Sequence, residues 1–129
     1  MNLAYYVVLF DLATDVLFDQ IEIGAGYRKA AAAGLFAVET HTVYRRELMA
    51  GDRVRVAARV IGAGSNRVHV AHEMFHADGG CAATQEILFV HVSLQTRRAT
   101  PLPDHIAICL SAGSSDVALP PWVGRRIVI

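Results

Sequence analysis

The sequence predicts an α+β domain in which one long helix is followed by an antiparallel sheet. Near the start, apolar residues recur with helical spacing. From residue 35 onward they alternate with polar residues, and turn sequences separate the segments. The 129 residues are 53% hydrophobic and carry a formal net charge of zero, which is typical of one compact domain. We therefore predict a single domain over residues 1–129.

The predicted helix covers residues 2–19. Its apolar positions follow the 3, 4, 7 spacing of a helix with one wide apolar face, and several of them are aromatic. Asn2 is a favourable residue for the N-cap. The width of the apolar face indicates that this helix is mostly buried. Glycine and alanine in residues 24–34 then indicate a loop or a short helical turn.

The predicted sheet has four strands, which we expect to form a meander. Its strand-like segments, separated by glycine-rich turns, lie at residues 35–48, 53–61, 67–77 and 81–94. Pro101 and Pro103 end the sheet, and the tail to Ile129 has only a weak pattern.

Residues 72–76 read His-Glu-Met-Phe-His, the HExxH spacing of zinc proteases. On a helix, two histidines four residues apart share a face and can bind one zinc ion. On a strand they lie roughly 13 Å apart, and Glu73 points to the opposite face. Because this segment lies between two turns and two better-marked strands, we predict a strand and no metal site.

Composition argues against several classes of function. Twelve basic residues balance twelve acidic ones, which argues against nucleic-acid binding driven by net charge. Cys81 and Cys109 lie far apart and indicate neither a disulfide framework nor a zinc site. The first residues lack a basic leader segment and are interrupted by Asp11 and Asp15, so we expect a cytoplasmic protein without a membrane span. The surplus of apolar residues predicts a homo-oligomer.

Several stretches together resemble the hotdog-fold acyl-CoA thioesterases of the 4-hydroxybenzoyl-CoA thioesterase type. MNLAYYVVLFDLATD resembles the start of their central helix, and three turns match theirs: Gly51-Asp52, Ser65-Asn66-Arg67 and Thr96-Arg97-Arg98. HEMFHADGG and the closing Gly124-Arg125-Arg126 are most similar to the betainyl-CoA thioesterases of carnitine degradation. The resemblance implies a hotdog fold, in which an antiparallel sheet wraps a long central helix.

One difference from the family concerns the region before the helix. The family usually has a strand and a D-x-N-G-H element directly before its Met-Asn pair, and the acidic residue there is the usual base or nucleophile. The sequence as given begins at Met1. We therefore expect the first strand and this carboxylate to be missing or truncated.

The resemblance implies hydrolysis of a small acyl-CoA, with betainyl-CoA as a candidate, to the free acid and CoA. It implies no cofactor besides this CoA substrate, and active sites between the subunits of a homodimer or tetramer. The Leu3 amide would polarise the thioester carbonyl, because free N–H groups at a helix N-terminus stabilise an oxyanion. Asn2 would orient water or only cap the helix. Asp11 would be a substitute base or a structural ion-pair partner.

The resemblance also implies where the rest of the substrate binds. Asn66, Arg67, Arg97 and Arg98 would hold the nucleotide end of CoA, since arginine binds phosphate. If the acyl group carries a quaternary ammonium, an aromatic cage is expected to hold it, although aromatic residues with helical spacing are more often core. The candidates are Tyr5, Tyr6, Phe10, Tyr44 and Trp122.

Two other functions remain possible on the same fold. One is a catalytically silent module that binds acyl-CoA or serves in oligomer assembly. The other is hydratase or dehydratase chemistry. That chemistry normally needs a histidine near the helix, and the first histidine in this sequence is His41.

Overall fold

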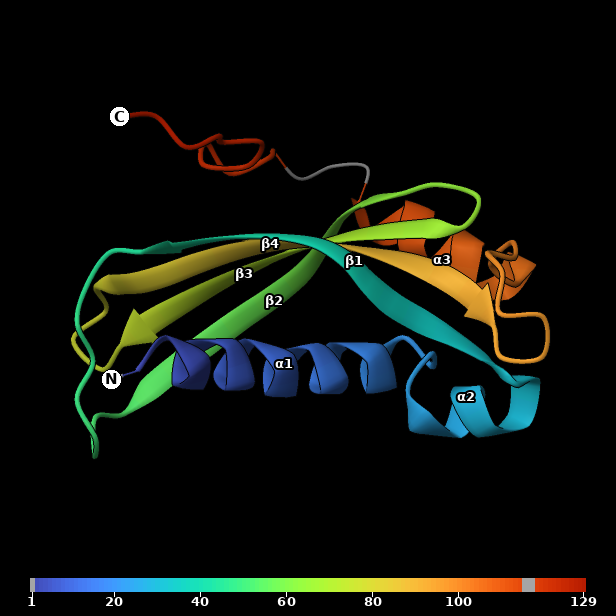
Figure 1. Cartoon of the computed structure of the whole chain (residues 1–129), viewed down its shortest axis with the longest axis horizontal. Coiled ribbons are helices and arrows are strands. Elements are labelled where there is room, and N and C mark those ends of the chain that lie inside the picture. The colour runs from blue at the N-terminus through green and yellow to red at the C-terminus, as the bar shows by residue number, and fades with distance from the viewer. Residues whose placement is uncertain (1, 115–117) are drawn as a thin grey trace.

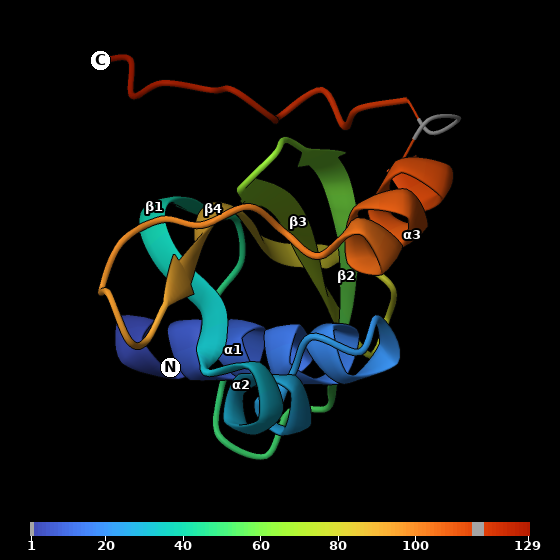
Figure 2. The ribbon, with the colours of Figure 1, turned by 90° about the vertical axis from the view of Figure 1, so that its right-hand side faces the viewer.

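A four-stranded antiparallel sheet curves over one long helix in the computed structural model, which describes residues 2–114 and 118–129 (Figure 1). The elements in chain order are α1 (Leu3–Gln20), α2 (Ala25–Ala31), β1 (Ala33–Tyr44), β2 (Val54–Ala63), β3 (Arg67–His76), β4 (Cys81–Ser93) and α3 (Asp104–Ser114). The predicted α+β class and the predicted long helix are confirmed. Figure 2 shows α1 below the sheet, whereas α3 lies beside β2.

The helix α1 begins at its predicted cap. Asn2 has extended backbone angles, and its side chain accepts a hydrogen bond from the Ala4 amide at 3.0 Å. The buried side chains recur every four residues and are those of Tyr6, Phe10, Thr14 and Phe18. This spacing places one face of the helix on the sheet, as the sequence predicts.

The strand order β1-β4-β3-β2 corrects one expectation. The last three strands form a meander, but β1 pairs with β4 instead of β2, from Ala33 opposite Ser93 to Tyr44 opposite Ala83. Residues 45–53 therefore connect one outer strand of the sheet to the other. Alternating apolar residues mark a strand and its two faces but do not identify its neighbours, so the sequence pattern could not give this order.

The HExxH segment is a strand, as predicted, and lies within β3. His72 is fully buried and contacts Thr14 of α1, whereas His76 lies beside Asp52 and Asp78. Within residues 2–114 and 118–129, no three His, Cys, Asp or Glu side chains are grouped so that they could hold a metal ion.

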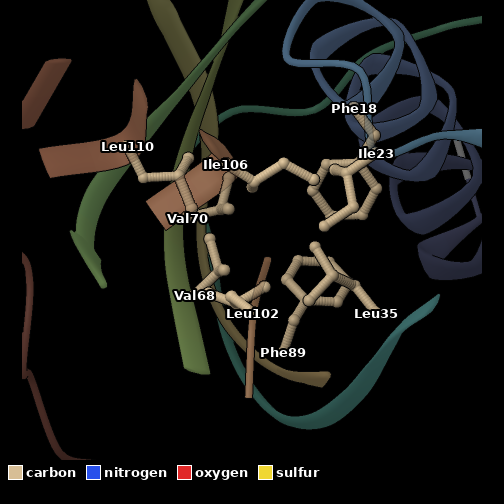
Figure 3. Close-up of a cluster of buried hydrophobic side chains, with 9 residues drawn as sticks. All are labelled: Phe18, Ile23, Leu35, Val68, Val70, Phe89, Leu102, Ile106 and Leu110. Carbon is tan, nitrogen blue, oxygen red and sulfur yellow. The ribbon is translucent and has the colours of Figure 1, made fainter. Parts of the chain in front are cut away.

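The apolar core consists of two clusters. The smaller one surrounds Tyr6 and Phe10 in the first half of α1. The larger one, drawn in Figure 3, joins the end of α1 to the sheet and α3 and contains Phe18, Ile23, Leu35, Val68, Val70, Phe89, Leu102, Ile106 and Leu110.

The helix α3 was not predicted, because only Ile106 and Leu110 carry its apolar face within the tail. None of the helices in the described ranges is both long and apolar enough to cross a membrane.

Candidate functional site

A hollow of about 340 Å³ lies at the N-terminus of α1. It is lined by Leu3, Tyr6, Tyr44, Arg45, Arg46 and Glu47. Helix, outer strand and loop thus meet around the residue whose amide was predicted to polarise a carbonyl. The hollow also brings an exposed aromatic ring, two guanidinium groups and one carboxylate to the same place.

The amides of the first turn of α1 are not equally available. The Ala4 N–H is bonded to the Asn2 side chain, and the Tyr5 N–H is bonded to the Asn2 carbonyl oxygen. The Leu3 N–H has no acceptor among the described residues. The partial positive charge of a helix N-terminus resides in such unbonded N–H groups. Of these three amides, Leu3 has the one that is free to bind an oxyanion, and Asn2 acts as the cap.

Tyr6 anchors the loop that forms one side of the hollow. Its ring is only 3% exposed and meets the Tyr44 ring edge-on, with centroids 5.1 Å apart. Its hydroxyl donates to the Arg46 carbonyl at 3.1 Å and accepts from the Leu48 amide at 3.0 Å. The Tyr6 hydroxyl is therefore occupied within the chain, although its side chain contributes to the lining.

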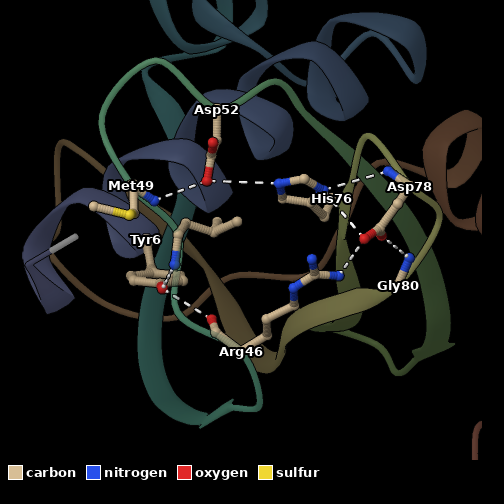
Figure 4. A network of polar contacts seen from close by, with 8 residues as sticks. Tyr6, Arg46, Met49, Asp52, His76, Asp78 and Gly80 are labelled. Atoms are coloured by element: carbon tan, nitrogen blue, oxygen red, sulfur yellow. Dashed lines mark hydrogen bonds and ion pairs between the residues drawn. The ribbon is translucent and has the colours of Figure 1, made fainter.

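Charged residues hold the same loop to the hairpin after β3 (Figure 4). Arg46 Nη1 lies 2.6 Å from an Asp78 carboxylate oxygen. His76 lies between two carboxylates, with Nε2 3.5 Å from Asp52 and Nδ1 3.6 Å from Asp78. The Gly80 amide, and then the Arg46 guanidinium, hold the pKa of Asp78 below its usual value. The Met49 amide also donates to Asp52 at 2.9 Å, so the loop is fixed at several points.

The structure separates Asp11 and Tyr5 from the lining of this hollow. Both are exposed on α1. Asp11 is eight residues from Leu3, which corresponds to about 12 Å along the helix axis. Glu47, which the sequence analysis did not single out, lies on the loop and lines the hollow. No local motif marks Glu47, because its position depends on how the loop folds back over α1.

The four residues predicted to hold CoA gather at the opposite end of the sheet. Asn66 and Arg67 lie where β2 turns into β3, and Arg97 and Arg98 lie in the turn after β4. The two turns are adjacent, since the His91 amide donates to the Asn66 carbonyl and the Ser93 amide donates to the Arg98 carbonyl.

This second group is far from the hollow within one chain. Strand β3 runs from Arg67 to His76, and nine steps at ~3.3 Å give roughly 30 Å between its ends. The structure therefore brings together the predicted nucleotide-binding residues. It does not bring them to the Leu3 amide of the same chain.

Comparisons with known proteins agree with this architecture. The family model described as the thioesterase-like superfamily matches residues 1–110. The betainyl-CoA thioesterase of Pseudomonas aeruginosa is 30% identical over 128 residues, which are 96% of this chain and 80% of that protein. The L-carnitine dehydrogenase/betainyl-CoA thioesterase of Agrobacterium fabrum is 36% identical over 99 residues, 77% of this chain but only 20% of that protein.

Solved structures show the same fold. A putative thioesterase from Pseudomonas putida has a TM-score of 0.82 at 27% identity, covering 100% of this chain and 84% of that one. A Staphylococcus aureus protein solved in complex with CoA has a TM-score of 0.90 at 24% identity, with the same coverage of 100% and 84%. The hotdog fold predicted from the sequence is confirmed by these likenesses.

Proposed function

This chain belongs to the thioesterase-like superfamily, and we propose that it hydrolyses a small acyl-CoA, with betainyl-CoA as the leading candidate. The chain is a thioester hydrolase of the acyl-CoA type. In the reaction, water oxygen bonds to the acyl carbon, the carbon–sulfur bond breaks and the CoA sulfur takes a proton. The proposed reaction uses no cofactor.

The observation that carries the mechanism is the unbonded Leu3 amide in a residue that lines the hollow. An N–H group held in this way stabilises the negative charge that develops on the thioester oxygen. Asn2 keeps the neighbouring Ala4 amide occupied. The proposal therefore assigns the oxyanion contact to Leu3 and the cap to Asn2.

We propose that one active site is built from two copies of the chain. The hollow and the Asn66, Arg67, Arg97 and Arg98 group lie at opposite ends of the sheet, roughly 30 Å apart in one chain. A two-fold axis beside an outer strand brings one end of a chain next to the other end of its partner. On the outer strand β1, Phe36 and Val38 are 41% and 58% exposed, which favours that strand as the interface.

For the base, Glu47 and Asp11 are the two candidates within the described chain. A base must reach the attacking water directly or through one further water. Glu47 is a candidate because it lines the same hollow as Leu3. Asp11 would have to act on a site formed with the partner. Glu47→Gln and Asp11→Asn each replace a carboxylate by an amide of nearly the same shape, so the variant with the larger loss of kcat identifies the base.

The acyl group would lie against the exposed aromatic rings near α1. A quaternary ammonium is attracted to aromatic faces. Tyr44 lines the hollow and is 40% exposed, and Tyr5 is exposed on the first turns of α1. The Tyr44 ring therefore remains available to a cationic acyl group in the hollow. Tyr5 would contact such a group only from outside the lining, and Tyr6 is held inside.

The function is tested by measuring hydrolysis of betainyl-CoA, acetyl-CoA and butyryl-CoA by the purified chain. We expect release of free CoA thiol, with the highest kcat/KM for betainyl-CoA. Loss of this preference in Tyr44→Leu would support the cation contact. CoA binding without hydrolysis of any of the three thioesters would reject the enzyme and favour a silent acyl-CoA module.

The proposed enzyme is a cytoplasmic homodimer or tetramer. Light scattering measures the number of subunits.

A further inference from the structure

A polar layer separates the two apolar clusters beneath the middle of α1. Thr14 and His72 are 4% and 0% exposed, and they lie between the cluster of Phe10 and the cluster of Phe18. On the sheet, His72 pairs in register with Gln85. Polar groups in the centre of a small core are costly to bury, so their presence calls for an explanation.

One arrangement of protons satisfies both contacts of the Thr14 hydroxyl. Thr14 Oγ1 lies 3.0 Å from the Phe10 carbonyl oxygen and 2.8 Å from His72 Nε2. Because a carbonyl oxygen only accepts, the Thr14 hydroxyl donates to Phe10, and the His72 Nε2–H donates to Thr14. His72 Nδ1 is then an unprotonated acceptor. This nitrogen is buried and has no hydrogen-bond partner among the described residues.

Stability does not explain this pair. A buried acceptor without a donor destabilises the fold, and apolar side chains of the same shape would fill the space at no such cost. A single polar contact in an apolar interface does, however, define how two elements are aligned along their axes. Aliphatic and aromatic contacts do not define alignment as sharply, because they are not directional.

Among the residues that the structure describes, the bond between Thr14 and His72 is the one side-chain hydrogen bond that joins α1 to a strand. The other polar contact of α1 is made by Tyr6, and it reaches the loop at Arg46 and Leu48. The adjacent rings of Phe10 and His72, with centroids 5.4 Å apart, hold the imidazole in place. Thr14 is eleven residues after Leu3, so any axial shift of the rigid helix at Thr14 moves the Leu3 amide equally.

We infer that the Thr14 to His72 contact sets the axial position of α1 and thereby places the Leu3 amide for thioester hydrolysis. Thr14 and His72 are thus positioning residues, and the inference rests on the proposed function. Misplacement of a reacting group by about 1 Å can lower a rate by about 100-fold. A small slip of α1 is therefore enough to affect turnover without unfolding the protein.

The test compares Thr14→Val, which keeps the shape and removes the hydroxyl, with Thr14→Ser, which keeps the hydroxyl. Ser111→Ala is the matched control, because Ser111 makes the same bond to the carbonyl four residues earlier but on α3. We expect Thr14→Val to lower kcat at least about tenfold with little change in KM. Thr14→Ser should restore most of kcat, and Ser111→Ala should have no effect. Wild-type kcat in Thr14→Val would overturn the inference.

His72→Phe and NMR chemical shifts test the same contact independently of Thr14→Val. If Thr14→Val does not fold, His72→Phe keeps a ring and removes the donor, and the same loss of kcat is expected. The ¹⁵N chemical shifts of the wild-type imidazole should show the proton on Nε2. If the wild-type chain hydrolyses no thioester, the proposed function fails separately. The amide shifts of residues 3–5 then decide the inference: they should change in Thr14→Val and stay constant in Thr14→Ser.

Discussion

The two ends of the sheet differ in whether their charged side chains have partners within the chain. At the N-terminus of α1, Arg46 forms an ion pair with Asp78, and His76 lies between Asp52 and Asp78, so that these side chains fix the loop beside the hollow. At the other end, the arginines at positions 67, 97 and 98 are exposed and form no ion pair with any described residue.

Paired and unpaired charges serve different purposes, since paired charges position the backbone and unpaired charges can bind a ligand. Charges that are paired inside the chain hold backbone groups in place but have little attraction left for a ligand. Unpaired arginines keep their capacity for bidentate bonds to phosphate. We propose that the first end serves the reaction and that the second binds the nucleotide of CoA. Since one substrate needs both, this proposal requires a site shared by two copies.

The largest effect is expected from removing the Leu3 N–H. Proline lacks this proton and is tolerated at the first position of a helix. The extended backbone of Asn2 also suits a residue before proline. We expect Leu3→Pro to lower kcat roughly 100- to 1,000-fold, the usual cost of losing one oxyanion donor. Steady-state kinetics would measure this.

Leu3→Ala is the control for that variant, because it shortens the side chain and keeps the amide. It should lose far less activity than Leu3→Pro, and both should melt near the wild-type temperature. Equal losses in the two variants would show that the side chain matters and the amide does not.

The buried layer between the two ends predicts a dependence of stability on pH. Burial lowers the pKa of His72 to about 4 from the ordinary 6.5. The unfolded state therefore binds this proton first as the pH falls. The free energy of unfolding should decrease between pH 6.5 and 4, by up to about 3 kcal/mol for this group.

Urea unfolding at several pH values measures this dependence in wild type and in His72→Phe. The variant should lose the part of the pH dependence that belongs to His72, while the other histidines contribute equally to both proteins. Identical slopes in the two proteins would contradict a neutral, buried His72.

The exposed arginines at positions 67, 97 and 98 should affect the binding of acyl-CoA and leave the rate of the chemical step unchanged. Losing a charge-assisted bond to phosphate costs about 1.5–3 kcal/mol, so Arg98→Ala should raise KM for acyl-CoA about tenfold or more and leave kcat nearly constant. The acyl-pantetheine analogue, which lacks the nucleotide, should be hydrolysed equally well by both proteins. A KM effect of the same size on that analogue would place Arg98 elsewhere in the site.

The smallest effect is expected from Tyr6→Phe. This change removes the hydroxyl shared by Arg46 and Leu48 and keeps the buried ring. We expect a loss of about 1–2 kcal/mol in the free energy of unfolding and a reduction of kcat of only a few-fold. Thermal or urea unfolding measures the first. An unchanged stability would mean that water replaces the hydroxyl and that the loop is held by its ion pairs.

The sequence was sufficient for the elements that carry a strong repeat. The apolar spacing of residues 2–19, the alternation in β2 and the long apolar run in β4 depend on local chemistry, so helix and strands were predicted within a few residues. The pairing of β1 with β4 and the helix α3 were not predicted, because both depend on contacts between distant segments.

The candidate site was predicted only where a motif marks it. The Leu3 amide and the arginine turns both followed from the resemblance. Glu47 reaches the hollow through the fold of the loop over α1, and His72 meets Thr14 across 58 residues of sequence. Neither contact leaves a local pattern, so the structure was needed to find them.

The shared site is tested most directly by mixing two variants that should each be nearly inactive at low substrate concentration, Leu3→Pro and the triple variant Arg67→Ala, Arg97→Ala and Arg98→Ala. In a mixed dimer, one site receives both defects and the other receives none. After unfolding and refolding together in equal amounts, the mixture should recover about a quarter of the wild-type rate at low substrate concentration, because half of the dimers are mixed. A rate equal to the mean of the two variants would show that each chain holds a complete site of its own.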